Sequence, residues 1–422
     1  MSTRRGACPS LREPMATGDG LLVRLSPAGT GWTPQELSTL AAAAARFGNG
    51  ILEVTSRGNL QIRGLTAESA EGLAKHVEAA AIPLRTGLAI DTGPLAGIDA
   101  EEIADPLPLA RALHEAVEAA ELTARLAPKC AVVIDGSGRL PLDDLIADVR
   151  LAADAATEGQ WLILVGGTAQ AARPVGSVAE TEAVAAVIGL LETIATKGRM
   201  ARGRDLTDAD LAACGPALHK APARPVIAPV GLFPLADGSL ATAFALPFGQ
   251  MDADTLIALS AAAAETAASE IRLAPGRGLI VPGLDAETCA AVEAKAITLG
   301  FISDPTDPRL SIAACAGAPY CASAHFATRA LGAEIAARAP GLLAGRTLHI
   351  SGCAKRCAEL PAPDFTILGS DGGCLVLPGD GRHAPAVPAV APEEALAALR
   401  RLADTELTHD RPLARKAQPA DS

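Results

Sequence analysis

Residues 51–65 read ILEVTSRGNLQIRGL, two short strand-like stretches divided by a polar turn. Helix-like stretches flank this hairpin at residues 33–48 and 66–80, and a further strand-like stretch, GDGLLVRLSP, precedes them at residues 18–27. The order predicted for this part of the chain is therefore strand, helix, strand, strand and helix.

The same order recurs about 220 residues further along the chain. A strand-like stretch at residues 241–250 precedes a helix-like stretch at 252–267, a hairpin-like stretch at 271–284 and a second helix-like stretch at 285–300. The segment LIVPGL in the second copy stands where LQIRGL stands in the first. Alanine-rich helices resemble one another by composition alone, but the matching order of elements favours an internal duplication.

The chain is too long for a single hydrophobic core, since 422 residues predict two or three compact units. Its net charge of −12 argues against a general nucleic-acid binder, which needs a basic surface. No apolar run is long enough to span a bilayer, and the first residues lack the apolar core of a signal peptide. We therefore expect a cytoplasmic protein without membrane or nucleic-acid partners, in which nine cysteines favour metal or catalytic roles over disulfides.

Four cysteines form two close pairs near the end of the chain. Five residues separate Cys315 from Cys321, and three separate Cys353 from Cys357. Two such pairs of thiolates can hold a cubane iron–sulfur cluster or a tetrahedral zinc ion. Zinc pairs mostly have two to four intervening residues, so the wider gap favours a [4Fe–4S] cluster over zinc and over unrelated buried thiols.

Small residues lie within or directly before the two pairs, where they would let the backbone approach a cluster and donate N–H groups to its sulfides; they are Gly317, Ala318, Gly352 and Ala354. We also expect a helix over residues 322–339. The positive end of that helix would favour the thiolate of Cys321 and offset the negative charge of a cluster.

The two cysteine pairs, behind two repeated half-domains, resemble the sulfite and nitrite reductase superfamily. The resemblance implies an α+β fold with two pseudo-symmetric ferredoxin-like half-domains plus a two-part α/β [4Fe–4S] cluster domain. It also implies that the four cysteines bind the cluster, and that Cys357 would bridge to sirohaem in a reductase. The matching division is 1–89 for the N-terminal segment and first half-domain, 90–225 for the first part of the cluster domain, 226–302 for the second half-domain, 303–402 for the second part with the cysteines, and 403–422 for a polar tail.

Within the superfamily, four stretches resemble the precorrin-3B synthase branch: GACPSLREPMATGDGLLVR (6–24), TSRGNLQIRGL (55–65), GPLAGID (93–99) and HISGCAKRCA (349–358). This resemblance implies O2-dependent hydroxylation of precorrin-3A at C-20 with formation of a ring-A γ-lactone, in aerobic cobalamin biosynthesis. It further implies an external electron donor and a mononuclear non-haem iron beside the cluster, although no ligand set for that iron stands out in the sequence.

A substrate with many carboxylates needs cationic partners, and arginine can bind a carboxylate through two hydrogen bonds. By resemblance, Arg57 matches the arginine of the superfamily's first half-domain and Lys129 matches the first of two lysines after the linker, so both are candidate catalytic and substrate-binding residues. The other candidates for substrate binding are Asn59, Gln61, Arg63, Arg199, Arg202, Arg204 and Arg277. The alternative is that these arginines are ordinary surface or strand-end charges with no role in substrate binding.

The other cysteines and histidines are less favoured as functional residues. His325 and His349 could serve as ligands of a second iron, but ordinary helix or strand positions are favoured. The sequence favours small core residues over ligands at the remaining cysteines, Cys130, Cys214, Cys289 and Cys374, and gives Cys8 little weight as a ligand.

Two departures count against the first alternative function, a sirohaem-dependent sulfite or nitrite reductase. Ala131 occupies the position of the second lysine, and GLAIDTGPLAG (87–97) contains no second anion-binding arginine. The second alternative, a non-enzymatic iron–sulfur electron carrier, is disfavoured by the repeated half-domains, which frame a tetrapyrrole in this superfamily. Arg356 stands where a glycine is more usual, so the resemblance does not extend to the conformation of the local turn.

Overall fold

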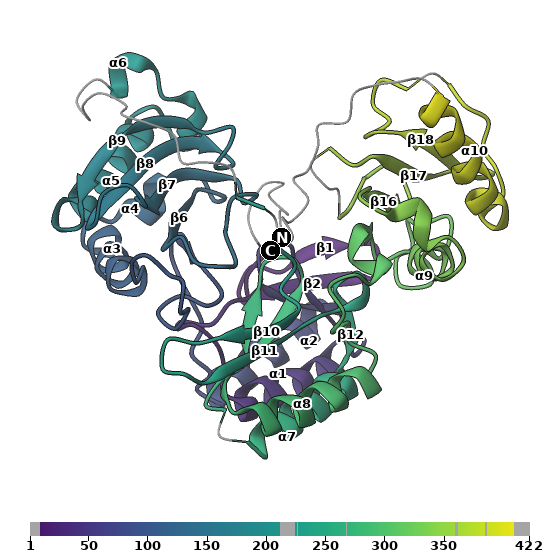
Figure 1. The fold of residues 1–422 in the computed structure, drawn as a ribbon, viewed down its shortest axis with the longest axis horizontal. Coiled ribbons are helices and arrows are strands. Elements are labelled where there is room, and N and C mark those ends of the chain that lie inside the picture. The colour runs from purple at the N-terminus through teal and green to yellow at the C-terminus, as the bar shows by residue number, and fades with distance from the viewer. Residues whose placement is uncertain are drawn as a thin grey trace, which may run out of the picture.

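The computed structural model describes residues 9–211, 224–225, 227–266, 268–358, 362–384 and 386–408. These residues form four β-sheets with flanking helices. Two of the sheets lie together at the base of the molecule, and the other two belong to units on either side of that base (Figure 1). The predicted α+β class is confirmed.

The first half-domain follows the order expected from its sequence. Its elements are β1 (Met15–Thr17), β2 (Gly20–Leu25), α1 (Pro34–Phe47), β3 (Ile51–Val54), β4 (Leu60–Leu65) and α2 (Ala67–Ala79). α1 begins at a capping box in which the Thr33 hydroxyl accepts from the N–H of Glu36 and the Glu36 carboxylate accepts from the N–H of Thr33. Pro34 at the first helical position lacks an N–H that would have no partner there.

The second half-domain repeats this order. Its elements are β10 (Gly231–Pro234), β11 (Leu240–Ala245), β12 (Gln250–Asp252), α7 (Ala253–Ala264), β13 (Arg272–Ala274), β14 (Gly278–Leu284) and α8 (Ala286–Thr298). Its own sheet has the strand order β10-β11-β14-β13, whereas β12 joins the sheet of the first half, which has the order β1-β2-β4-β3-β12.

The two half-domains are joined by reciprocal strand pairing. β12, which precedes α7 of the second half, pairs antiparallel with β3 of the first, and Met251 lies opposite Leu52. Trp32, which precedes α1 of the first half, pairs in the same way with Ile271 of the second. Their backbone N–H groups donate to each other's carbonyls at 3.1 and 2.7 Å. The buried faces of both halves form one hydrophobic core. The repeated order of helices and strands confirms the predicted duplication.

The central unit lies between the half-domains in sequence. Its elements are β5 (Ala89–Thr92), α3 (Leu107–Ala119), α4 (Leu122–Arg125), β6 (Ala131–Asp135), β7 (Ala147–Ala153), β8 (Gln160–Gly167), β9 (Arg173–Ala179), α5 (Glu180–Thr196) and α6 (Asp208–Leu211). Strands β5, β6 and β7 are parallel, and β8 and β9 continue the sheet antiparallel. Trp161 is fully buried in the core between this sheet and α3 and α5.

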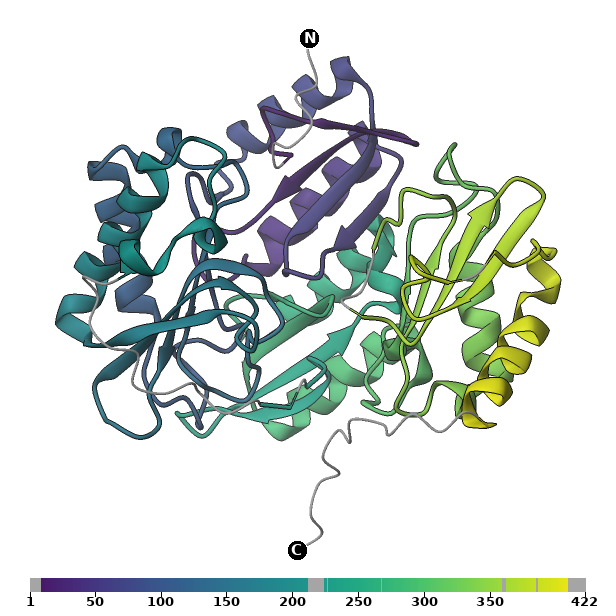
Figure 2. The same cartoon turned by 90° about the horizontal axis from the view of Figure 1, so that it is seen from above.

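The C-terminal unit has a similar sheet. Its elements are β15 (Ile312–Ala314), α9 (Thr328–Arg338), β16 (Leu348–Ser351), β17 (Phe365–Ser370), β18 (Gly373–Pro378) and α10 (Ala395–Thr408). β15, β16 and β17 are parallel and β18 is antiparallel. Seen from above, the strands of the first half-domain lie between this unit and the central unit (Figure 2). The proposed division of the chain stays a proposal; β5 begins one residue before its boundary at residue 90.

The helix expected over residues 322–339 is shorter, because α9 begins only at Thr328. The backbone N–H groups of the preceding segment are used elsewhere: that of Ala322 donates to the carbonyl of Gly18, and that of His325 to the carbonyl of Gly352. Those donors cannot also make helical hydrogen bonds. The expected helix-dipole effect on Cys321 is therefore wrong, since that residue lies seven positions before the helix.

Among the described residues, no helix combines the length and apolar character needed to cross a membrane.

An unusual carboxyl group lies in the central unit between the loops that follow β5 and β6. Glu102 accepts a hydrogen bond from the N–H of Gly97 at 2.7 Å. Burial raises the pKa of Glu102 to about 7, and nearby negative charges act in the same direction, those of Asp105, Asp99 and Asp135. The folded protein therefore holds a proton here that the unfolded chain releases at lower pH.

Replacement Glu102→Gln is expected to weaken the pH dependence of stability. The stabilisation from protonated Glu102 is fully present below about pH 4.5 and is lost as the pH rises through about 7. We expect this group to lower the free energy of unfolding of the unaltered protein by about 1–3 kcal/mol between pH 5 and pH 8. Urea unfolding at both pH values measures the effect. The exposed neighbour's variant, Glu101→Gln, should keep the full decrease, and an equal decrease in Glu102→Gln would contradict the assignment.

Candidate functional site

Both cysteine pairs follow neighbouring parallel strands of the C-terminal unit. β15 ends at Ala314, next to Cys315, and β16 ends at Ser351, two residues before Cys353. In the register of the two strands, Ala314 lies opposite Ile350. Because parallel strands have their carboxyl ends at one edge of a sheet, the two cysteine loops begin side by side.

Cys315 is buried and is held by backbone contacts from both loops. Its N–H donates to the carbonyl of Ile350 at 3.0 Å, and its carbonyl accepts from the hydroxyl of Thr328 at 2.7 Å. The N–H of Gly352 donates to Cys315 Sγ at 3.2 Å. Such N–H donors stabilise cluster sulfurs, and this contact agrees with the expectation that small residues let the backbone reach the sulfur.

Cys321 lies against the turn between β1 and β2 of the first half-domain. The N–H of Ala322 donates to the carbonyl of Gly18 at 3.1 Å. A Cβ atom at Gly18 would lie 2.4 Å from Cys321 Sγ, which is far inside normal contact distance. The turn at Gly18 therefore forms part of the wall around the cysteines.

The Cys357 thiol interacts electrostatically with the other three thiols of the two pairs. Burial raises the pKa of the Cys357 thiol, and the charges of Cys315, Cys353 and Cys321 raise it further. Four thiolates that repel one another need cations between them, which the iron of a [4Fe–4S] cluster supplies. The donor set and the Gly352 N–H fit such a cluster. In the part of the chain that the structure describes, no group of three or more His, Cys, Asp or Glu side chains is arranged for a single metal ion.

The turn between Cys353 and Cys357 has a glycine-like backbone although it contains Arg356. The φ angle of Arg356 is 53°, in the left-handed region that glycine favours. This conformation costs about 1–2 kcal/mol in a residue with a side chain. The guanidinium of Arg356 donates to the carbonyl of Asp380, which anchors the turn to the segment after β18.

A row of polar side chains crosses the sheet of the first half-domain. Arg24 on β2 lies opposite Gln61 on β4, which lies opposite Glu53 on β3, and Glu53 lies opposite Gln250 on β12. The amide of Gln61 accepts from Arg24 at 2.8 Å and donates to Glu53 at 2.9 Å. These residues alternate with core residues such as Leu52, so they project from the opposite face of the sheet.

The corresponding face of the second half-domain is mostly apolar. Its buried Arg272, opposite Ile280, donates to two backbone carbonyls of the central unit. Ala243 and Ile280 occupy equivalent middle positions, and Leu95 and Leu140 of the central unit pack on them. Only the first half therefore carries the polar row, although the two halves share one topology.

Glu53 connects the polar row to the cysteine loops. Its carboxylate accepts from Arg63 at 3.0 Å and from Arg329 of α9 at 2.5 Å. Arg63 also donates to both oxygens of Asp19, at 2.8 and 2.9 Å. Although burial opposes the shift, these hydrogen bonds and the charge of Arg63 lower the pKa of Asp19. Asp19 follows Gly18, so this network borders Cys321.

Arg277 contributes a further cation from the second half-domain. It has a φ angle of 69° and is half-buried. Burial lowers the pKa of Arg277, while the charge of Glu53 raises it and that of Arg329 lowers it. Its side chain makes no hydrogen bond or ion pair with the residues that the structure describes. It is thus available to an anionic ligand.

Arg57 and Asn59 lie in a second group, at the contact between the first half-domain and the central unit. Arg57 donates to Asp91 of β5 at 2.5 Å and to the carbonyl of Ile146 at 2.8 Å. Arg85 donates to the other oxygen of Asp91 at 2.9 Å and lies 3.5 Å from the side-chain oxygen of Asn59. Arg85 is thus a second arginine beside Arg57, and it stands two residues before the segment 87–97, which itself contains none.

The remaining cationic candidates include residues beside the start of β6 and β7 in the central unit. Arg202 is bound to Asp148 at 2.8 and 2.9 Å, and to the carbonyl of Lys129 at 2.9 Å. The side chains of Lys129, Arg199 and Arg204 are exposed. The structure thus brings Gln61, Arg63 and Arg277 together and places the run from Arg199 to Arg204 elsewhere.

The histidine candidates and the remaining cysteines complete the set of sequence-based candidates. His349 is buried in β16 with Nε2 3.2 Å from the carbonyl of Cys357, and His325 is exposed. Three of the remaining cysteines are buried, as expected for core residues, namely Cys130, Cys289 and Cys374. Cys8 and Cys214 lie outside the described residues.

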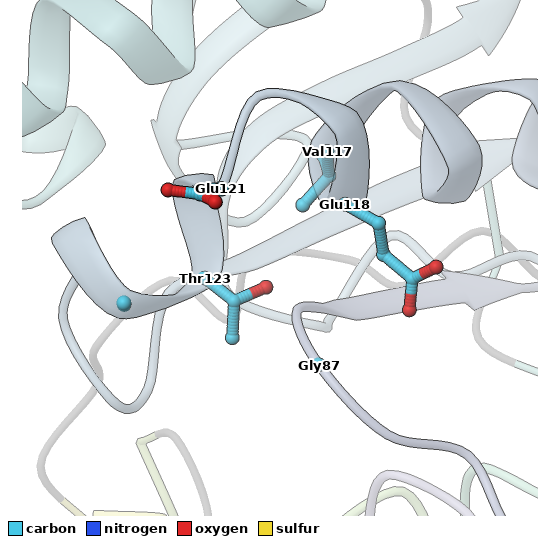
Figure 3. A pocket seen from close by; sticks show the side chains of 6 residues that line it. Gly87, Val117, Glu118, Glu121 and Thr123 are labelled. Carbon is cyan, nitrogen blue, oxygen red and sulfur yellow. The ribbon is translucent and has the colours of Figure 1, made fainter.

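A hollow of about 430 Å³ lies beside α3 and α4 (Figure 3). Its lining includes Gly87, Val117, Glu118, Glu121 and Thr123. None of the candidate site residues lines it, and its two carboxylates would repel a substrate rich in carboxylates. The hollow does not match the expected substrate.

Comparison with known proteins identifies the family. The chain is 43% identical over 391 residues to a protein of Sinorhizobium sp named precorrin-3B synthase, and the match covers 91% of this chain and 85% of that protein. The chain belongs to the precorrin-3B synthase family. It is therefore an enzyme, an oxidoreductase of tetrapyrrole chemistry, and the alternative of a non-enzymatic electron carrier is wrong.

Two further similarities concern nitrite and sulfite reductases. Residues 13–80 match the nitrite/sulfite reductase ferredoxin-like half domain. The fold is similar to that of the NirA protein of Mycobacterium tuberculosis, with a TM-score of 0.71, 19% identity, and coverage of 94% of this chain and 82% of that one. Proteins of this superfamily usually carry an iron–sulfur cluster and sirohaem.

Residues of the site that are not among the sequence-based candidates include Asp19, Arg24, Glu53, Arg85 and Arg329. The alternation of Leu52, Glu53 and Val54 in β3 is a signal that could have identified an outward-facing carboxylate. No local sequence pattern identifies Arg329, because its role depends on the contact of α9 with the first half-domain.

Replacement Gly18→Ala is expected to impair assembly of an iron–sulfur cluster. The added methyl would lie 2.4 Å from Cys321 Sγ and would displace either that sulfur or the β1–β2 turn. We expect a several-fold lower iron and sulfide content per chain after anaerobic purification. The matched variant Gly29→Ala, where a Cβ meets nothing within 4 Å, should keep the unaltered protein's content. Full iron content in Gly18→Ala would show that the turn does not bound the site.

Proposed function

We propose that the chain catalyses the O2-dependent hydroxylation of precorrin-3A at C-20, with formation of the ring-A γ-lactone, in aerobic cobalamin biosynthesis. The observation that carries this proposal is the 43% identity, over 91% of the chain, to a protein named precorrin-3B synthase. The arrangement of the site supports it, because four cysteines and a group of arginines lie side by side. The reaction is proposed to take place in the cytoplasm.

The charge balance of the site suits an anionic substrate. Two carboxylates, of Glu53 and Asp19, lie among the guanidinium groups of Arg63, Arg277 and Arg329. Positive charge therefore exceeds negative charge here, although the whole chain has a net charge of −12. In such partly buried surroundings, charge-assisted hydrogen bonds to substrate carboxylates are strong.

We assign different weights to the candidate residues from their contacts. Arg277 is the first choice for a carboxylate of the substrate, since it has no partner among the described residues. Arg63, Gln61 and Asn59 are proposed to fix the substrate's orientation, while Arg57 and Lys129 stay the proposed catalytic residues. Beside Lys129, further contacts with the substrate are proposed for Arg199, Arg202 and Arg204.

We propose that a [4Fe–4S] cluster is held by Cys315, Cys321, Cys353 and Cys357. When bound, it supplies single electrons that come from an external donor. In the overall reaction one oxygen atom of O2 enters the product and the other leaves as water, which consumes two electrons and two protons. A mononuclear non-haem iron is part of the proposal without assigned ligands.

One observation favours the alternative of a sirohaem-dependent sulfite or nitrite reductase. Arg85 stands beside Arg57 at Asp91, so the site has a second arginine that could bind a small anion. The missing second lysine, replaced by Ala131, still counts against that alternative.

Anaerobic purification followed by spectroscopy and turnover separates these functions. We expect about four iron and four sulfide per chain, no extractable tetrapyrrole, and O2 uptake that depends on precorrin-3A. A sirohaem absorption band with sulfite or nitrite reduction would replace the proposal by the alternative. A protein with the cluster that leaves precorrin-3A unchanged in the presence of a reductant and O2 would overturn it.

Replacement Arg277→Ala is expected to raise the KM for precorrin-3A by about tenfold or more, as expected for the loss of a hydrogen bond to a charged group. Steady-state O2 uptake at varied substrate concentration measures this. The control Arg12→Ala removes an exposed arginine that pairs with Glu78 on the surface, and it should leave KM unchanged. An unchanged KM in Arg277→Ala would remove this residue from the substrate site.

A further inference from the structure

Arg329 is a buried cation near the cysteines that is only partly paired. It is the second residue of α9, and its side chain is only 14% exposed. One nitrogen, Nη2, donates to Glu53 at 2.5 Å. The other two, Nε and Nη1, are buried without a hydrogen-bond partner among the described residues. A buried donor without an acceptor is costly, and more so in a charged group.

A second donor in the same row also lacks an acceptor. Gln250 lies opposite Glu53 in the pairing of β12 with β3, and its Nε2 is buried without a partner among the described residues. Glu53 already accepts from Gln61, Arg63 and Arg329. The place between α9 and this sheet therefore has an excess of donors and of positive charge.

The cysteine loop is the adjoining element. Thr328, the residue before Arg329, donates to the carbonyl of Cys315 at 2.7 Å, and its hydroxyl lies 3.9 Å from Cys315 Sγ. Gly317 packs so closely on Thr328 that a Cβ there would lie 2.3 Å from the hydroxyl. The start of α9 is thus fixed against the loop, and Arg329 is fixed with it.

From this geometry we propose that Arg329 is the buried counter-charge of the iron–sulfur cluster and raises its reduction potential. The inference rests on the proposed [4Fe–4S] cluster. A cluster with four thiolate ligands has a net negative charge, and reduction adds one further negative charge. A cation in a low-dielectric position nearby stabilises the reduced state more than the oxidised state. Glu53 holds the guanidinium in place and partly offsets its charge.

A role limited to holding α9 on the half-domain explains less. The contact from Nη2 to Glu53 is sufficient for that purpose, and a neutral donor could make it. Such a role leaves the positive charge and the two unpartnered N–H groups without a function. The two roles differ in a measurable quantity, because a purely structural residue does not change the potential of an intact cluster.

An EPR-monitored redox titration of the purified holoenzyme tests the proposal. In Arg329→Gln, we expect the ratio of reduced to oxidised cluster at a fixed solution potential to fall about tenfold, which for one electron corresponds to a shift of about 59 mV. Arg329→Lys keeps the charge and should stay within about threefold of the unaltered protein. Arg338→Gln removes the same charge from the exposed far end of α9, about 14 Å away, and should cause no shift.

The variant Glu53→Gln provides a test of opposite sign. It removes the offsetting negative charge and retains a similar shape, so the reduced fraction should increase. If Arg329→Gln cannot hold iron, Glu53→Gln decides the proposal. No shift in Glu53→Gln, no shift in an iron-replete Arg329→Gln, or an equal shift in Arg338→Gln would overturn it.

Failure of the inference differs visibly from failure of the proposed function. Absence of iron and sulfide from the unaltered protein would refute the cluster and the inference with it. A normal cluster with normal potentials in all variants would refute only the inference. The expected shifts, together with no turnover of precorrin-3A, would support the inference and refute the proposed substrate.

Discussion

Parallel pairing of β15 with β16 is the constraint on which the site depends. Cys315 and Cys353 are far apart in sequence, and they meet because their strands end at the same edge of one sheet. The hydrogen bond from Gly352 to Cys315 Sγ is a direct consequence, since it joins the loop of one strand to the sulfur of the other. With the loops fixed in this way, Cys321 contacts the β1–β2 turn and α9 approaches β3.

The site is assembled from pieces that are incomplete on their own. Asp19 and Glu53 come from the first half-domain, Arg277 from the second and Arg329 from the C-terminal unit. Each carboxylate interacts with arginine, yet the arginines are in excess, so the site keeps a local positive charge within an acidic protein. Local excess charge of this kind, rather than the average over the chain, determines which ligand is attracted.

Periodicity in the sequence was sufficient to predict the repeated hairpins and their helices, whereas the binding of one cluster by the four cysteines stays a prediction. Contacts distant in sequence explain the failures. Residues before Thr328 are not helical because Ala322 and His325 donate to Gly18 and Gly352 instead. Strand β7 gives a weak signal because it contains Arg150, a buried arginine whose two terminal nitrogens donate to the carbonyls of Leu142 and Leu145. Arg329 has no local signature, since its significance depends on what α9 faces.

The reciprocal exchange between the half-domains has the form of a two-fold symmetric dimer interface. Trp32 meets Ile271 and β3 meets β12, so each half gives the other the same kind of segment that it receives. In a true homodimer, a substitution on one face appears on both. Fusion of two copies into one chain removes that restriction. One face could then become mostly apolar and bind the central unit, while the other accumulated charged residues beside the cysteines.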